Sequence, residues 1–448
     1  MTQVAPDLIA RYSKPVPRYT SYPTAPHFSP AVSNLHYVDW LQALPENADI
    51  SLYLHVPFCQ QLCWYCGCNT KAARRYDPIA RYLTALENEI ETVGSLVPRS
   101  HSVRHIHWGG GSPNILSAAH IRQLSEQLQR AFHVSGGVEF AVEVDPRHLS
   151  GPQVEAFGDA GVTRVSIGVQ DFAPRVQRAI NRLQPYALTE RAIALFRERG
   201  IASINMDLVY GLPEQTMTTL VETIGRVIKL APERVAAFGY AHLPSRFKNQ
   251  RMIDGSVLPD VVTRYGMSET ISQMLCDAGY TRIGFDHYAL PSDTLASRPV
   301  ARNFQGYTTD QATALIGMGA SAIGRLGGGY IQNATPTADY IRRIETDGLA
   351  VVRGLSMSED DKIRAFAIER LMCDFQFSST EMERRFGAAA RPLIAEADAL
   401  VRSDADGLVE RADDGFRVTD LGRPFVRSLC AHFDSYLRQS AAQHSAGV

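Results

Sequence analysis

Four of the seven cysteines in this chain lie within ten residues of one another, and they are the residues best suited to carry chemistry. Cys59, Cys63 and Cys66 follow the spacing C-x-x-x-C-x-x-C, and Cys68 comes two residues later. Cysteine thiolates bind iron–sulfur clusters, usually four to a cubane. Three ligands leave one iron open, much as a catalytic zinc site keeps a free coordination position. The spacing therefore favours a [4Fe–4S] cluster with room for a further ligand.

Two other uses of these cysteines, a structural zinc site and a redox dithiol, remain open at this point. Zinc normally draws on a second pair of ligands, and the sequence offers no second C-x-x-C or H-x-x-x-H pair. His105 and His107 are close together, but they fall on a predicted strand beside Trp108, and we expect them to divide between core and surface. The role of Cys68 stays open, because a fourth thiolate would close the cluster.

The elements that must position these cysteines alternate between strand and helix. Six β-rich runs are predicted at residues 51–56, 103–108, 138–144, 163–169, 203–209 and 235–241. After the first run, Ile79, Leu83, Leu86 and Ile90 recur on one helical face. This alternation predicts an α/β fold with βαβ units around a parallel sheet. Six units in about 190 residues favour a partial (β/α)6 barrel, and no G-x-G-x-x-G motif indicates an open dinucleotide-binding sheet.

Every predicted strand ends in glycine or a polar residue. The cysteines follow the first strand, and the later strand ends carry Gly109–Pro113, Glu143, Gln170, Asp207 and the run Tyr-Ala-His at 240–242. In parallel α/β barrels the catalytic groups lie at the carboxyl ends of the strands. We therefore expect these residues to surround one cavity.

The two flanks of the barrel have different patterns. Residues 8–38 contain Arg11, Lys14 and Arg18, five prolines and no acidic residue, which predicts an extended, docked arm without helix or strand. From about Ser356 the pattern becomes helical, and Asp414-Gly415 predicts a hairpin. The expected organisation is an arm over residues 1–45, a core over 46–355, and a mostly helical, winged-helix-like lid over 356–448.

Composition and charge exclude several classes of function. Hydrophobic residues make up 45% and charged residues 21%, as in ordinary globular proteins. Net charge is −2, and residues 356–448 hold 12 Lys/Arg against 16 Asp/Glu, so we expect no nucleic-acid binding. No apolar run reaches about 18 residues, and the start lacks a signal-peptide pattern. We therefore expect a cytoplasmic protein that does not enter membranes.

Several motifs together resemble a known family. The cysteine spacing with Tyr65 before the third cysteine, and the run Gly-Gly-Gly-Ser-Pro at 109–113, are similar to those of radical S-adenosylmethionine (SAM) enzymes. Pro-Arg-Tyr-Thr-Ser-Tyr-Pro-Thr-Ala at 17–25, Cys-Gly-Cys-Asn at 66–69 and Asn-Phe-Gln-Gly-Tyr-Thr-Thr at 303–309 narrow the likeness. Nearly the whole chain resembles the oxygen-independent coproporphyrinogen III oxidases.

The resemblance implies both cofactors and a reaction. Cys59, Cys63 and Cys66 would bind a [4Fe–4S] cluster, and two molecules of SAM would bind per site. A 5′-deoxyadenosyl radical formed from SAM would start the decarboxylation of two propionates of coproporphyrinogen III to vinyl groups, giving protoporphyrinogen IX for haem synthesis. Flavodoxin or ferredoxin would donate the electron, and an unknown acceptor would take the last one. The family habit is a monomer.

The resemblance also implies individual site residues. Tyr53 and Glu143 would be catalytic. The SAM contacts would be Tyr53, Tyr65, Gly110, Gly111, Ser112, Glu143, Gln170, Arg182, Asp207, Ala241, Gln305 and Ile323. The residue types agree, because carboxylates accept hydrogen bonds from hydroxyl and ammonium groups, and arginine pairs with carboxylates.

The basic residues of the arm are candidates for binding the substrate. The substrate carries four carboxylates, and we expect Arg11, Lys14 or Arg18 of the arm to hold its propionates. A related radical SAM haem chaperone or haem-degrading protein is one alternative. A non-enzymatic metal- or DNA-binding regulator is the other.

Overall fold

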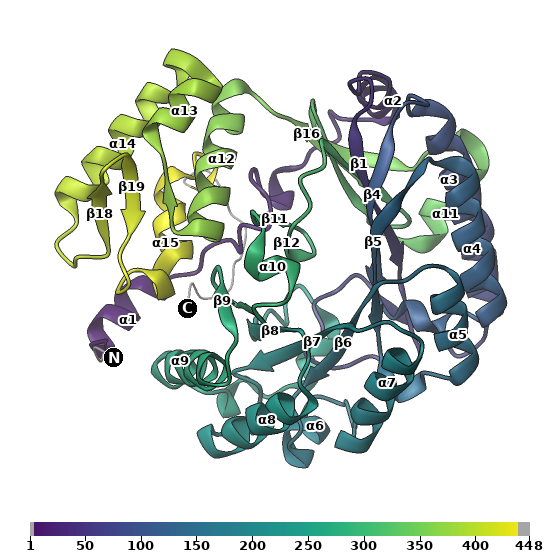
Figure 1. Cartoon of the computed structure of the whole chain (residues 1–448), viewed down its shortest axis with the longest axis horizontal. Helices are drawn as coiled ribbons and strands as arrows, with labels where there is room; N and C mark the ends of the chain where they lie inside the picture. The colour runs from purple at the N-terminus through teal and green to yellow at the C-terminus, as the bar shows by residue number, and fades with distance from the viewer. Residues whose placement is uncertain (1–3, 438–448) are drawn as a thin grey trace.

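The computed structural model describes residues 4–437 and is built around six parallel strands (Figure 1). These are β1 (Asp49–Val56), β4 (Ser102–Gly110), β5 (Val134–Val144), β6 (Arg164–Gln170), β7 (Ser203–Tyr210) and β8 (Arg234–Gly239). Each pairs in parallel with the next. All six predicted strands are confirmed, because the β-rich runs are long and buried.

Six further strands extend this sheet at its two ends. On the β1 side lie β13 (Ala314–Met318), β14 (Ile323–Leu326), β15 (Gly329–Asn333) and β16 (Val351–Ser356), and on the β8 side lie β10 (His287–Ala289) and β9 (Thr281–Ile283). Apart from β13, which is parallel to β1, they pair antiparallel. They were not predicted, since they are short and have no helical crossover between them.

Helices cover the outer face of the barrel (Figure 1). They are α3 (Asp77–Leu96), α4 (Ala118–Ala131), α5 (Gly151–Asp159), α6 (Pro174–Ala179), α7 (Tyr186–Glu198), α8 (Met217–Leu230), α9 (Val261–Asp277) and α11 (Thr337–Asp347). Ile79, Leu83, Leu86 and Ile90 are all buried in α3, as their spacing predicts. The largest hydrophobic core lies between these helices and the sheet. Among the described residues, no helix is long and apolar enough to cross a membrane.

The arm is extended only in its middle. The prediction of an arm free of helix is wrong at both ends, where α1 (Pro6–Tyr12) and α2 (Asn34–Gln42) form. Proline fits the first turn of a helix, as Pro6 does, and Ser33 caps α2 in a capping box with His36. Between these helices the arm crosses the open side of the barrel (Figure 1). Ser29 of the arm bridges to Gly354 of β16.

The C-terminal region forms a second unit with its own core (Figure 1). Its helices are α12 (Glu359–Asp374), α13 (Ser379–Phe386), α14 (Arg391–Ser403) and α15 (Val426–Cys430), and its sheet comprises β17 (Gln376–Phe377), β18 (Val409–Ala412) and β19 (Gly415–Val418). The predicted hairpin is confirmed by the pairing of β18 with β19. Tyr19 and Tyr22 of the arm are buried in this core. The domain boundaries stay a prediction, and residues 1–3 and 438–448 of the predicted arm and lid lie outside the described residues.

Candidate active site

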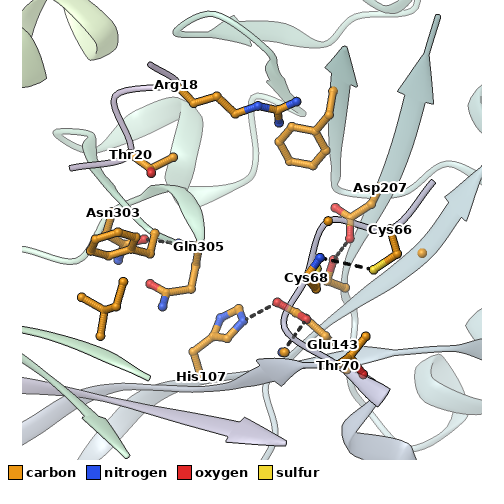
Figure 2. Close-up of a pocket in the computed structure, with 18 of the residues that line it drawn as sticks. Arg18, Thr20, Cys66, Cys68, Thr70, His107, Glu143, Asp207, Asn303 and Gln305 are labelled. Atoms are coloured by element: carbon orange, nitrogen blue, oxygen red, sulfur yellow. Dashed lines mark hydrogen bonds and ion pairs between the residues drawn. The ribbon is translucent and has the colours of Figure 1, made fainter. Parts of the chain in front are cut away.

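A cavity of about 830 Å³ lies at the carboxyl ends of the barrel strands and is closed on one side by the arm. The predicted site residues that line it are Cys59, Cys63, Cys66, Tyr65, Gly110, Gly111, Ser112, Glu143, Gln170, Arg182, Asp207, Ala241, Gln305 and Ile323. Figure 2 shows Cys66, Cys68, Glu143 and Asp207 on one side of this cavity, facing Thr20, Asn303 and Gln305 across it. Gln305 lies between β11 (Ala301–Asn303) and β12 (Gly306–Thr308). The strand ends therefore meet as the sequence predicts.

The cysteine loop is held in place by side chains from distant parts of the chain. The Asn249 side-chain amide donates hydrogen bonds to the carbonyls of Cys63, Trp64 and Cys66 at 3.1, 3.2 and 2.8 Å. Its neighbour Gln250 donates to the carbonyl of Tyr65 at 2.9 Å. These contacts orient the loop that carries the sulfur atoms. Neither residue was predicted to belong to the site, because nothing in their local pattern shows that they meet a loop more than 180 positions earlier.

Positive charge and hydrogen-bond donors surround the three sulfur atoms. Arg147 and Arg182 approach Cys63 Sγ at 3.4 and 3.5 Å, and both also pair with Asp145. Burial raises the pKa of the Cys59 thiol to about 11, whereas the hydrogen bond from Cys68 lowers the pKa of Cys66 to about 7. Guanidinium groups stabilise thiolates, which are the form that binds metal. Arg182, which was predicted to pair with a carboxylate, therefore also stabilises the thiolate of Cys63.

The donor set fits a cubane cluster. Cys59, Cys63 and Cys66 come from one loop and line one cavity. Among residues 4–437, no group of three or more His, Cys, Asp or Glu side chains is arranged to hold a metal ion. In a cubane, by contrast, each thiolate binds a different iron, so the sulfur atoms need not converge on one point. Buried atoms without a hydrogen-bond partner, Arg147 Nη1 and Arg182 Nε, lie on the two arginines beside Cys63.

The glycines at the end of β4 are required by close packing against the segment before Cys59. Gly110 has φ +108°, and a β-carbon there would lie 2.5 Å from Cε1 of His55. A β-carbon on Gly111 would lie 2.4 Å from the Phe58 carbonyl oxygen. Both positions therefore demand glycine to join the end of β4 to the segment before Cys59.

Glu143 sits between His107 and the end of β4. It accepts hydrogen bonds from His107 Nε2 and from the Gly110 N–H, both at 3.1 Å (Figure 2). Burial acts to raise the pKa of Glu143, but His107 and the Gly110 N–H outweigh it, and the net pKa lies below the ordinary value. Glu143 is thus held as a carboxylate facing the cavity.

One expectation about β4 changes. His105 and His107 do not divide between core and surface, because residues two apart on a strand share a face, and both line the cavity. Tyr53 is not among the cavity-lining residues. Its hydroxyl bonds to His55 Nδ1 at 2.9 Å, and its ring lies 5.8 Å from that of His107.

Asp207 and Gln170 complete the far wall. Asp207 accepts hydrogen bonds from Ser166 Oγ at 2.7 Å and Asn205 Nδ2 at 2.8 Å, and burial raises its pKa. Gln170 adopts φ +67°, an uncommon conformation for a residue other than glycine. That turn places a buried amide at the edge of the cavity.

Of the three basic arm residues, only Arg18 reaches the cavity. Arg11 instead forms an ion pair with Asp406 at 2.7 Å, and Lys14 is exposed and outside the cavity. Arg18 donates from Nη2 to the Gly239 carbonyl at 2.7 Å and points into the cavity (Figure 2).

Comparison with known proteins identifies the same two parts of the chain. Residues 53–227 match the model of the radical SAM superfamily, and residues 357–425 match that of the HemN C-terminal domain. The oxygen-independent coproporphyrinogen III oxidase of Bradyrhizobium diazoefficiens is 45% identical, with 99% of each chain covered. That of Paracoccus denitrificans is 41% identical, with 97% of this chain and 96% of the relative covered.

A solved structure agrees over almost the same length. Coproporphyrinogen III oxidase (HemN) from Escherichia coli, described as a radical SAM enzyme, is 38% identical and superposes with a TM-score of 0.89. The match covers 94% of this chain and 98% of that one. The matches extend over nearly the whole chain, and the chain belongs to the oxygen-independent coproporphyrinogen III oxidase family of radical SAM enzymes.

Proposed function

We propose that this chain catalyses the SAM-dependent oxidative decarboxylation of two propionate side chains of coproporphyrinogen III to vinyl groups, giving protoporphyrinogen IX. The observation that carries this proposal is the cavity at the strand ends, in which the cysteine loop faces the arm and Gln305. A [4Fe–4S] cluster and SAM, the cofactors of radical SAM enzymes, supply one-electron cleavage of a carbon–sulfur bond when bound. The names of the full-length relatives support the substrate.

On one side of the cavity, the proposed role of the side chains is to bind and orient the cluster and SAM. Cys59, Cys63 and Cys66 hold the cluster, and Arg147 and Arg182 offset its thiolate charge. The SAM contacts proposed are Tyr65, Gly110, Gly111, Ser112, Glu143, Gln170, Arg182, Asp207, Ala241, Gln305 and Ile323, all of which line the cavity. The volume of about 830 Å³ lies in the upper part of the range of ligand pockets, which agrees with more than one ligand, including a second SAM.

The two proposed catalytic residues take different roles. Glu143 faces the cavity as a carboxylate and accepts hydrogen bonds from an ammonium or hydroxyl group of a ligand. Tyr53 acts through His55 and His107, so its role is that of a positioning residue.

On the substrate side, the arm closes the cavity. Val16–Ser21 and Thr24–Pro26 line it, and Arg18 offers a positive charge to a propionate. A closed site keeps water away from a reactive intermediate. Flavodoxin or ferredoxin as the electron donor, a monomeric state and a cytoplasmic location belong to the same proposal, and the seven free cysteines agree with a reducing compartment.

Anaerobic product analysis tests the function. Reconstituted enzyme is incubated with coproporphyrinogen III, SAM and a reductant, and tetrapyrroles are separated after oxidation. Formation of the divinyl product together with 5′-deoxyadenosine supports the proposal. Haem binding without a vinyl product would identify a chaperone instead and overturn it.

A further inference from the structure

Among residues 4–437, seven arginines line the cavity, and four of them are paired with carboxylates. Arg147 and Arg182 pair with Asp145, Arg164 pairs with Glu139, and Arg234 pairs with Asp293. Arg18, Arg246 and Arg353 have no carboxylate partner within the described part of the chain. Arg18 has already been assigned to a propionate under the proposed function. The positive charges of Arg246 and Arg353 have no assigned partner.

Arg246 and Arg353 are close enough to influence one another. The pKa of Arg353 is lowered by burial and by the positive charge of Arg246. Arg353 Nε donates to Gln332 Oε1 at 2.7 Å, and Gln332 is itself fixed by donating to the Ser321 carbonyl at 3.1 Å. This arrangement leaves both terminal nitrogens of Arg353 without a partner among residues 4–437. The Arg246 guanidinium lies 5.4 Å from the Phe247 ring centroid and, within the same residues, makes no side-chain hydrogen bond.

The two arginines come from opposite ends of the sheet. Arg353 lies on β16, at one edge, beside the point where Ser29 of the arm bridges to Gly354. Arg246 lies on the loop after β8, three residues before Asn249, which holds the cysteine loop. Both therefore lie where the barrel is open and where the arm closes it, as Figure 1 shows for β16, β8 and the arm.

Like charges in one cavity repel unless an anion lies between them. A guanidinium is suited to a carboxylate because its planar fork donates two parallel hydrogen bonds. The proposed substrate brings four carboxylates, more than Arg18 alone satisfies. We infer that Arg246 and Arg353 form a carboxylate clamp, which binds propionate side chains of the substrate at the open side of the barrel. This inference rests on the proposed function and names the residues that select a tetracarboxylate macrocycle.

The clamp is tested by binding rather than turnover. The variants are Arg246→Gln, Arg353→Gln and the double variant, and the control is Arg191→Gln on the outside of α7. Coproporphyrin III, the stable oxidised tetracarboxylate, and its tetramethyl ester are titrated by fluorescence into the reconstituted holoenzyme. Each single variant is expected to bind coproporphyrin III about tenfold more weakly, as for loss of one charge-assisted hydrogen bond, and the double variant more weakly still. Ester binding, SAM affinity and iron content stay at wild-type values.

Other results overturn the clamp. An unchanged dissociation constant for coproporphyrin III in the double variant, an equal loss with the ester, or a loss of SAM affinity would each do so. Arg246 is exposed, so its variant is not expected to misfold. The Lys variants at both positions add a check, because they keep the charge but lose the fork, and they should bind with intermediate affinity. If the wild type and the double variant convert coproporphyrinogen III with the same KM, the clamp is wrong but the proposed function stands. If the wild type does not convert coproporphyrinogen III at all, the proposed function is wrong as well.

Discussion

Gly110 shows how a single residue determines whether the cysteine loop can form. Two features exclude a side chain at this position: the φ of +108°, and the overlap that a β-carbon would have with the His55 imidazole. From sequence, the triple glycine was expected at a strand end and, by resemblance, Gly110 and Gly111 were expected to contact SAM; in the structure these glycines lie against the segment before the cysteines. That contact was not predictable, because β1 and β4 meet only in the folded sheet.

We predict that Gly110→Ala prevents stable cluster assembly without unfolding the barrel. Gly137 is a matched control, since its φ is +84° but nothing lies within 4 Å of a β-carbon there. Gly137→Ala is expected to cost about 1–2 kcal/mol of stability, because alanine disfavours a positive φ, and to keep full iron content. Iron and sulfide per chain after reconstitution are the measurement. Equal iron content in the two variants would show that the contact with His55 does not matter.

Glu89 is a buried carboxyl with a consequence for pH dependence. It accepts hydrogen bonds from Gly319 N–H, Tyr340 O–H and Asn333 Nδ2, yet burial raises its pKa to about 7. Because the folded protein holds this proton more tightly than the unfolded chain, the contribution to stability is full below about pH 4.5 and is lost as pH rises through about 7.

We therefore predict that Glu89→Gln removes part of the pH dependence of unfolding. Between about pH 5 and about pH 8, the free energy of unfolding of the variant minus that of the wild type should rise by roughly 2–3 kcal/mol. Chemical denaturation of both proteins across this range is the measurement. A constant difference at all pH values would mean that Glu89 titrates normally.

At the scale of elements, the strand ends were predictable and their supports were not. Alternating β-rich and helical runs place Glu143, Asp207 and the cysteines at one edge of a parallel sheet, and the structure confirms this. Asn249 and Gln250 were missed because they lie in a 3₁₀ helix of five residues, Lys248–Met252, which is too short to show a periodic pattern. The strands β13–β16, which carry Ile323 and Arg353, were missed because short strands resemble loops in sequence.

We predict that Asn249→Ala loosens the cysteine loop. Three loop carbonyls lose their shared donor, so the cluster should be lost faster on exposure to air, while the fold persists. Lys248→Ala, at the exposed neighbouring position, is the control. The rate of bleaching of the cluster absorbance is the measurement, and equal rates for the two variants would contradict a positioning role for Asn249.

At the scale of the whole molecule, the arm joins the two domains. Tyr19 is buried in the C-terminal core and donates to Asp434 Oδ2 at 3.0 Å, and Arg427 donates to the carbonyls of Val16 and Pro17 at 2.7 and 3.1 Å. The prolines indicated a docked arm, but its docking partners lie about 400 residues away in sequence and leave no local pattern. Deleting residues 1–30 would therefore damage the C-terminal domain as well as substrate binding.

We predict that Tyr19→Phe weakens the contact between the arm and the C-terminal domain with less damage than the deletion of residues 1–30. Loss of the hydroxyl leaves buried Asp434 short of one donor and should cost about 1–3 kcal/mol. Tyr12→Phe is the matched control, because its hydroxyl bonds to Asp406 in a half-buried position and its loss should cost less than about 1 kcal/mol. Proteolytic sensitivity and chemical denaturation of the C-terminal domain are the measurements. Equal effects of the two substitutions would contradict the role given to the arm.

The most direct test of the account is reductive cleavage of SAM by a variant in which Cys59, Cys63 and Cys66 are all replaced by alanine. With anaerobic reconstitution and a strong reductant, the wild type is expected to form 5′-deoxyadenosine, whereas the variant should form none above background. Formation at the wild-type rate by the variant would contradict the assignment of these three cysteines to a cluster, and with it the function proposed for the chain.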